Sequence, residues 1–173
     1  TIQPKISEVT SDLTTSADDD KKLALEKSLI ETTRLLLREY GIRKSGAAIR
    51  EAVEIRHKFI GPREAVSSII SFGFKASFGN IKLKKLSEEF FPLIVFHNNG
   101  EACLIKAAPS NDIVSITKPF HKEPTEVKIS DFGKDFSEYV ILLKELNKRE
   151  KEESSGHWFF SAFKKSKWIY IQV

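Results

Sequence analysis

The chain has 173 residues, of which 40% are hydrophobic and 30% charged, with a net charge of +4; this composition is typical of one globular domain with its own core. No run of 18 apolar residues and no signal peptide occur, so the sequence predicts no membrane-spanning helix. The single cysteine, Cys103, excludes an intramolecular disulfide and fits a reducing compartment. The chain begins at Thr1 and contains no Met, so we expect it to be part of a longer protein or to have been processed.

The positive charge is concentrated near the end of the sequence. Residues 157–173 contain Lys164, Lys165 and Lys167 and no acidic residue. A nucleic-acid-binding domain usually has a basic face on its folded body, so this distribution argues against a nucleic-acid partner. It favours a basic segment beside a membrane. The sequence has no Gly-x-x-x-x-Gly-Lys loop and no metal-ligand spacing of His or Cys, so we expect no cofactor and no metal.

The first predicted helix follows a polar start. Residues 1–20 are rich in Ser, Thr and Asp without a sustained period, which predicts a poorly ordered lead-in. From Lys21 apolar residues recur at helical spacing, and Gly41 ends the run. This helix opens the domain that we expect over residues 21–144.

Two shorter helices are predicted next. Ser45 is a suitable N-cap for the second helix. The third begins at Gly61-Pro62, where Pro fits the first helical position, and ends at Gly73. Its expected inward face consists of Ala65, Val66, Ile69 and Ile70.

The apolar period changes from 3.6 to 2 after Gly73, which indicates strands. Asn98-Asn99-Gly100 predicts a turn between two of them. Three helices followed by strands with short connections predict an α+β domain with helices packed on an antiparallel sheet. Residues 145–156 are highly charged and predict a linker. The expected strands cover residues 74–78, 92–96, 101–106, 113–116, 127–129 and 139–144.

Residues 157–173 combine aromatic and basic side chains. Aromatic residues beside lysines are typical of an interfacial helix. A helix packed on the domain's own core is the alternative. The candidate membrane-interface residues are Trp158, Phe159, Lys164, Lys165, Trp168 and Tyr170.

Several of these segments resemble parts of a known family. The strand-turn-strand unit over residues 92–105 resembles the peptidase domains of bacteriocin-exporting ABC transporters, which are papain-like cysteine peptidases. The helix ending at Tyr40-Gly41 resembles their first long helix, and Lys118-Pro119 occupies the place of an Asp-Pro pair. Residues 156–170 resemble the elbow before the first transmembrane helix in exporters of RTX adhesins. The resemblance extends from about Leu23 to Val173 and implies a papain-like fold.

The resemblance also assigns the catalytic positions. It places Ser28 at or near the nucleophile, Glu101 (or Ala102, one residue on) at the histidine, and Lys118 at the aspartate. A papain-like peptidase needs a thiolate, an imidazole that activates it and a group that orients the imidazole. None of the three is present at these positions. The resemblance therefore implies the non-cleaving, degenerate peptidase-like domain of haemolysin-type and adhesin-type exporters.

The first functional hypothesis is a docking module. The domain would hold an unfolded RTX-type substrate on the cytoplasmic side of the bacterial inner membrane, for the transmembrane and ATPase domains of a homodimeric type I secretion transporter. An extended chain would pair with a sheet edge or contact aromatic residues near the degenerate cleft. The docking candidates are Phe90, Phe91, His97 and Phe120.

Two other hypotheses remain open. In one, the domain is an active peptidase that cleaves a Gly-Gly leader with Cys103 as a displaced nucleophile. The position of Cys103 in the middle of a strand instead favours a buried thiol that packs as a small hydrophobic residue. In the other, the domain is a structural module that stabilises transporter assembly.

Overall fold

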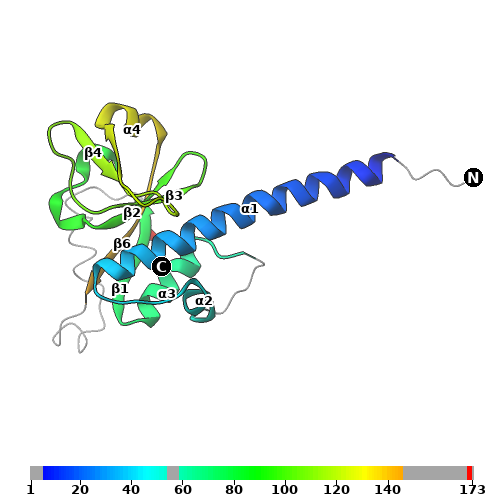
Figure 1. Ribbon diagram of the computed structural model, residues 1–173, viewed down its shortest axis with the longest axis horizontal. Coiled ribbons are helices and arrows are strands. Elements are labelled where there is room, and N and C mark those ends of the chain that lie inside the picture. Colours follow the sequence, from blue (N-terminus) through cyan, green and yellow to red (C-terminus); the bar gives the residue numbers. More distant parts are fainter. Residues whose placement is uncertain (1–5, 54–58, 146–170, 173) are drawn as a thin grey trace, which may run out of the picture.

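The computed structural model describes residues 6–53, 59–145 and 171–172, with side chains described over residues 17–53 and 59–145 (Figure 1). Three helices precede all of the described strands, as expected. In chain order the elements are α1 (Ile6–Glu39), α2 (Gly46–Glu51), α3 (Pro62–Ser71), β1 (Phe74–Asn80), the 3-10 turns Leu83–Lys85 and Glu88–Phe90, β2 (Leu93–His97), β3 (Ala102–Ile105), β4 (Ile113–Ile116), β5 (Thr125–Lys128), α4 (Ile129–Asp135), β6 (Phe136–Glu145) and β7 (Ile171–Gln172).

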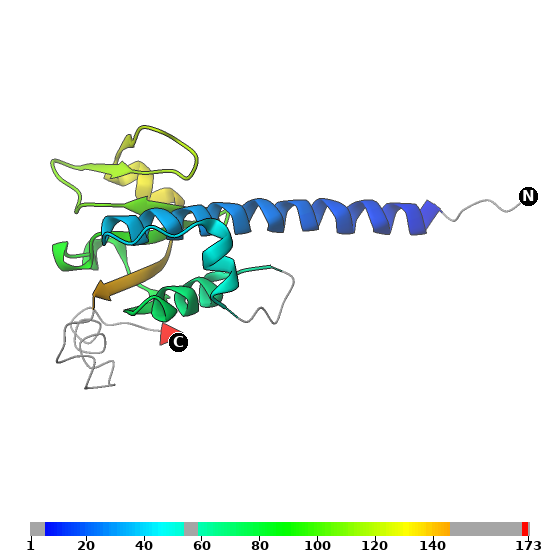
Figure 2. The ribbon, with the colours of Figure 1, turned by 60° about the horizontal axis from the view of Figure 1, so that its bottom comes forward.

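The start of α1 corrects one expectation. The helix begins at Ile6, well before Lys21, so most of residues 1–20 is helical and not the poorly ordered lead-in that their composition predicts. Adding a residue to an existing helix is much easier than starting one, so weak helix formers such as Ser, Thr and Asp can extend a helix that its C-terminal half holds in the core. Figures 1 and 2 show this N-terminal part of α1 projecting beyond the body of the domain.

The main sheet has the strand order β3-β2-β6-β1-β7, and all neighbouring strands are antiparallel. In its centre Ile94 of β2 lies between Leu104 of β3 and Ile141 of β6. Strands β4 and β5 form a separate antiparallel pair, Ile113 lying opposite Lys128. The sheet and the helices packed on it confirm the predicted α+β architecture.

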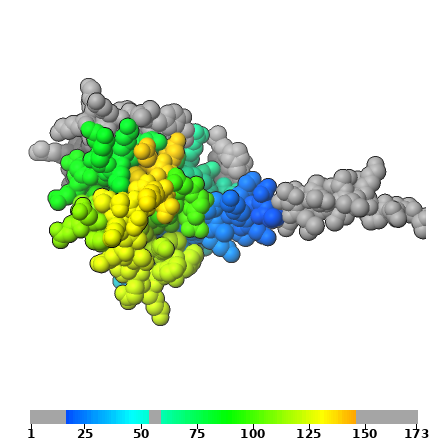
Figure 3. All heavy atoms as spheres, turned by 90° about the horizontal axis from the view of Figure 1, so that it is seen from above, coloured from blue at the N-terminus to red at the C-terminus, as the bar shows by residue number. Residues whose placement is uncertain are grey.

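Side-chain alternation along the strands gives the sheet two buried faces. Alternate residues such as Ile94, Ala102 and Leu104 join the cluster formed with α1, α2 and α3, which we call the helical face. The residues between them, such as Val95 and Cys103, join the cluster formed with β4 and α4, which we call the far face. In the space-filling view of Figure 3, the yellow-green and yellow segments around residues 110–135 lie together on one side of the molecule. Burial of both faces explains why the central strands are continuous apolar runs.

The short helices agree with the sequence except at one residue. The Ser45 hydroxyl accepts a hydrogen bond from the amide of Ala48 at 3.1 Å and caps α2. Ala65, Val66 and Ile69 of α3 are buried, but Ile70 is 43% exposed. Each residue turns the helix by about 100°, so Ile70, one step beyond Ile69, lies past the boundary of the buried stripe.

Of the two expected C-terminal segments, 145–156 and 157–173, the structure describes only Glu145, Ile171 and Gln172. Ile171 and Gln172, which we expected in an interfacial segment, pair with Gly79 and Phe78 at the edge of the sheet. The rest of the predicted linker beyond Glu145 and the six candidate membrane-interface residues lie outside the described residues. Within the described ranges, no helix has both the length and the apolar content required to cross a bilayer.

Candidate functional site

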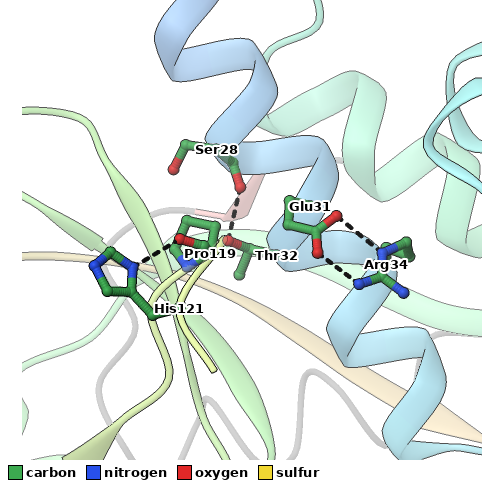
Figure 4. A network of polar contacts seen from close by, with 6 residues as sticks. All are labelled: Ser28, Glu31, Thr32, Arg34, Pro119 and His121. Carbon is green, nitrogen blue, oxygen red and sulfur yellow. Dashed lines mark hydrogen bonds and ion pairs between the residues drawn. The ribbon is translucent and has the colours of Figure 1, made fainter. Parts of the chain in front are cut away.

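Ser28 lies on α1 where that helix crosses the start of β3. The side chain is buried, and its hydroxyl both donates to the carbonyl and accepts from the amide of Ala102, at 3.3 Å each. One turn further along α1, the Thr32 hydroxyl donates to the Ser28 carbonyl at 2.7 Å (Figure 4). The sequence leaves two candidates for the histidine position, Glu101 and Ala102. Of these, Ala102 is the one that forms hydrogen bonds with Ser28.

Glu101 and Lys118 come together at a different place. Both line a pocket of about 380 Å³, which we call the polar pocket, together with His97, Asp131 and Asp135. Lys118 reaches it because Leu104 and Thr117 form an antiparallel bridge that holds the chain after β4 beside β3. The structure therefore brings Glu101 and Lys118, two of the three predicted site positions, to one pocket, while Ser28 contacts Ala102, the residue after Glu101. The residues that line the polar pocket include no serine, threonine or cysteine, so the pocket itself offers no hydroxyl or thiol nucleophile.

The only thiol points away from Ser28. Ala102 lies on the helical face, and the next residue, Cys103, belongs to the far face. Cys103 is 1% exposed, and burial raises the pKa of its thiol to about 12 against the opposing influence of Lys118. A thiol with that pKa is protonated at neutral pH, and the thiolate is the nucleophilic form. Its expected packing as a small buried hydrophobic residue is confirmed.

His97 ends β2 and is half-buried, although the turn that follows it is exposed. Burial lowers the pKa of its imidazole; the carboxylates of Asp135 and Glu101 oppose this effect, and Lys118 reinforces it. The ring contacts Phe132 edge-on, with the ring centroids 6.1 Å apart. His97 therefore favours the neutral imidazole at neutral pH, held against an aromatic ring at the edge of the polar pocket.

The turn after His97 is fixed from two sides. Asn98 donates from its amide to the Asp135 carbonyl at 2.7 Å and from its side chain to the Lys134 carbonyl at 2.9 Å. Gly100 has a φ of +89°, and a Cβ there would lie 3.3 Å from the Leu25 side chain of α1. The turn is thus packed between α4 and α1, which places His97 and Asn98 between two hollows.

The second hollow is a pocket of about 500 Å³, which we call the apolar groove. It lies between α1, the segment 59–62 and the sheet. Phe78 stacks on Tyr139 with ring centroids 5.3 Å apart and meets Phe96 edge-on at 5.7 Å. Tyr139 is 39% exposed, so an aromatic surface is available to a ligand. The lining residues are Lys22, Leu25, Glu26, Leu29, Phe59, Ile60, Gly61, Pro62, Phe78, Phe96, His97, Asn98, Gly100, Ser137 and Tyr139.

The four docking candidates have different surroundings. His97 lines both hollows. Phe120 is 72% exposed. Phe91 is partly buried against the far-face cluster. Phe90 is 6% exposed and belongs to that cluster, which corrects its assignment to a docking surface; its neighbours in sequence are charged, but the 3-10 turn Glu88–Phe90 directs its ring inward.

The sequence interpretation missed the aromatic wall of the groove. It placed Phe78 at the end of the expected strand 74–78 and Tyr139 at the start of the expected strand 139–144. The two residues come from β1 and β6, which are far apart in the chain, and only the strand register brings Tyr139 opposite Asn80, next to Phe78. No local sequence pattern links the two residues, so the sequence carried no signal for this wall.

Comparison with solved structures finds the same fold in peptidase domains of transporters. The N-terminal peptidase C39-like domain of the toxin secretion ATP-binding protein from Vibrio parahaemolyticus has a TM-score of 0.57 and 19% identity, covering 70% of this chain and 96% of that one. A double-glycine-motif protease from an AMS/PCAT transporter, solved with its leader peptide, has a TM-score of 0.58 and 16% identity, covering 66% and 81%. The peptidase domain of Streptococcus ComA, a bifunctional ABC transporter, has a TM-score of 0.56 and 16% identity, covering 66% and 88%.

Sequence comparison gives the family directly. No curated protein matches the chain. The model of the Peptidase C39 family matches residues 26–148, a span that runs from the part of α1 carrying Ser28 to the end of β6 and beyond. The matched span is more than half of the chain and the papain-like α+β fold agrees with it, so the chain belongs to the Peptidase C39 family.

Proposed function

We propose that this domain is a non-cleaving peptidase-like module of a type I secretion ABC transporter, and that it docks an unfolded RTX-type protein before export. The observation that carries the proposal concerns α1: its Ser28 hydroxyl is hydrogen-bonded to the main chain of Ala102, and the same helix lines the accessible apolar groove. The parent protein would be a homodimer with transmembrane and ATPase domains, and this domain would face the cytoplasm at the inner membrane. Residues 157–173 would form its juxtamembrane elbow.

Neither candidate nucleophile of the domain, Ser28 or Cys103, is in a reactive environment. A serine hydroxyl needs a base to become reactive. Both hydrogen bonds that Ser28 makes through its hydroxyl go to the main chain of Ala102, and neither Ala102 nor Glu101 carries an imidazole. Cys103, the thiol of the rival hypothesis, is buried on the far face with a raised pKa. These features favour a domain that binds a chain and leaves it intact.

The apolar groove has a surface suited to binding an unfolded chain. Its lining is mainly apolar and aromatic, while Lys22 and Asn98 supply polar groups at its margin. Such a surface suits the side chains of an extended segment that has not yet folded. Binding is expected to be weak, because ordering a flexible chain costs free energy. The solved protease bound to a leader peptide shares this fold, which supports a peptide as the occupant.

The docking proposal predicts saturable binding of an unfolded repeat segment. A synthetic segment of RTX nonapeptide repeats, kept unfolded with EDTA, is titrated into the 15N-labelled domain, and amide chemical shifts are recorded. We expect shifts around the groove with a Kd on the order of 100 µM. Calcium folds such repeats, so adding calcium should reverse the shifts.

Two variants test the location of binding. Tyr139→Ala removes an exposed ring from the groove and should weaken binding by about tenfold. Leu23→Ala is a matched control, because Leu23 is similarly exposed (40% against 39%) but does not line the groove. Equal weakening by both variants, or no shifts at millimolar peptide with the fold intact, would refute docking and favour the structural-module hypothesis.

The same proposal predicts that a Gly-Gly leader peptide is not cleaved. The domain is incubated with a fluorogenic double-glycine leader for a day, and the products are analysed by mass spectrometry. We expect turnover no higher than in buffer, in the wild-type domain and in Cys103→Ala alike. Cleavage that disappears in Cys103→Ala would establish the active-peptidase hypothesis in place of ours.

A further inference from the structure

A third, chemically different hollow lies where α1 turns into α2. It has a volume of about 280 Å³ and is lined by Arg34, Arg38, Arg43, Lys44 and Ser45, which we call the cationic pocket. Arg34 and Arg38 are four residues apart, so they lie on the same side of the helix. Gly41 has a φ of +80°, a conformation that L side chains rarely adopt, and the turn there brings the other three residues back beside α1.

The four cations are only partly neutralised by neighbours. Arg34 forms a two-point contact with Glu31, with N–O distances of 2.9 and 2.5 Å, which raises the pKa of its guanidinium (Figure 4). Lys44 lies over the Phe72 ring, 5.1 Å from its centroid. The adjacent carboxylate of Glu39 is taken by Lys106 at 3.1 Å. Over residues 17–53 and 59–145, Arg38 and Arg43 have no carboxylate within ion-pair distance.

Ser45 adds an oriented neutral donor. Its oxygen already accepts the Ala48 amide at 3.1 Å, so the hydroxyl hydrogen remains available to a ligand. Guanidinium groups recognise phosphate oxygens through paired, charge-assisted hydrogen bonds, and an ammonium group adds a point charge. Four like charges around one hollow repel each other, and a multivalent anion relieves that repulsion.

We propose that the cationic pocket binds a phosphate-bearing anion, with Arg38 and Arg43 as the main ligands and Lys44 and Ser45 as supporting donors. The site is distinct from the apolar groove: no residue lines both, and on α1 the groove ends at Leu29 and the cationic pocket begins at Arg34. The shared chemistry is phosphate, carried either by an anionic lipid headgroup or by a soluble polyphosphate. This inference does not depend on the docking function.

The first experiment titrates inorganic pyrophosphate into the 15N-labelled domain at low ionic strength. We expect saturable shifts of the Arg38 and Arg43 side-chain Nε–H signals and of the Ser45 amide. The double variant Arg38→Gln, Arg43→Gln should weaken binding at least about tenfold, because it removes two charge-assisted partners. The double variant Lys84→Gln, Lys85→Gln is the matched control: it lowers the net charge equally at exposed residues outside the pocket.

The second experiment identifies the source of the phosphate. The domain is sedimented with phosphatidylglycerol vesicles and with phosphatidylcholine vesicles, with and without pyrophosphate. Binding to the anionic vesicles alone, displaced by pyrophosphate and lost in the pocket variant, assigns a lipid headgroup. Saturable pyrophosphate shifts without vesicle binding assign a soluble phosphate. Absence of saturable shifts at 10 mM pyrophosphate, or equal weakening by the control variant, overturns the proposal.

Discussion

Iodoacetamide is expected to alkylate Cys103 at least about a thousandfold more slowly in the folded domain than in the urea-unfolded chain at pH 8. The thiolate is the reacting form, and burial raises the pKa of the Cys103 thiol from 9.0 to about 12. A rise of three pKa units lowers the thiolate fraction by about a thousandfold at that pH. Burial on the far face, with 1% exposure, slows access further. The rate is measured by intact-mass spectrometry.

An exposed thiol in the same fold supplies the control. The double variant Cys103→Ser, Ser115→Cys moves the thiol to an exposed position on β4, and it should react at nearly the same rate folded and unfolded. The single variant Cys103→Ser should incorporate no label. Fast labelling of the wild-type folded domain would show an accessible thiolate and would revive Cys103 as a nucleophile.

The second large effect concerns the helical face. Leu36→Ala should lower the free energy of unfolding by about 2–5 kcal/mol, the usual range for a leucine truncated in a packed core. Leu36 is fully buried, within the cluster that joins α1 to the sheet, so the truncation leaves a cavity between the two layers. Urea unfolding followed by circular dichroism gives the value.

Leu23→Ala separates packing from helix propensity. The substitution is chemically identical and lies on the same helix, but Leu23 is 40% exposed. Its expected effect stays within about 0.5 kcal/mol. Similar losses in both variants would mean that α1 does not pack on the sheet as described.

The sequence predicted the sheet better than the helix boundaries. The continuous apolar run Leu93–Phe96 is a strong strand signal because both faces of the sheet are buried, and the turn ending at Gly100 has a local cause, its positive φ. The start of α1 has no such cause, because Ser, Thr and Asp before Lys21 have weak helix propensity and the helix depends on what lies downstream. Local composition therefore misplaced the boundary.

The candidate site was predictable only in part. The resemblance assigned Ser28 to the nucleophile position, which stays a prediction; the structure places its hydroxyl against the main chain of Ala102 at the start of β3. Strand alternation alone would have put Cys103 on the opposite face from Ala102. The groove was not predictable, because Phe78 and Tyr139 come from strands whose distance depends on tertiary packing. Arg38 and Arg43 are only five residues apart, and they line one pocket because of the positive φ of Gly41 between them.

The turn from His97 to Gly100 has one more consequence. His97 and Asn98 line both the apolar groove and the polar pocket, so this turn separates the two hollows. A ligand in one hollow that displaces this turn would also change the shape of the other hollow. By thermodynamic linkage, each ligand would then change the affinity of the other by the same factor. The backbone amide of Asn98, which donates to the Asp135 carbonyl, lies in this turn, so its chemical shift should report a ligand in either hollow.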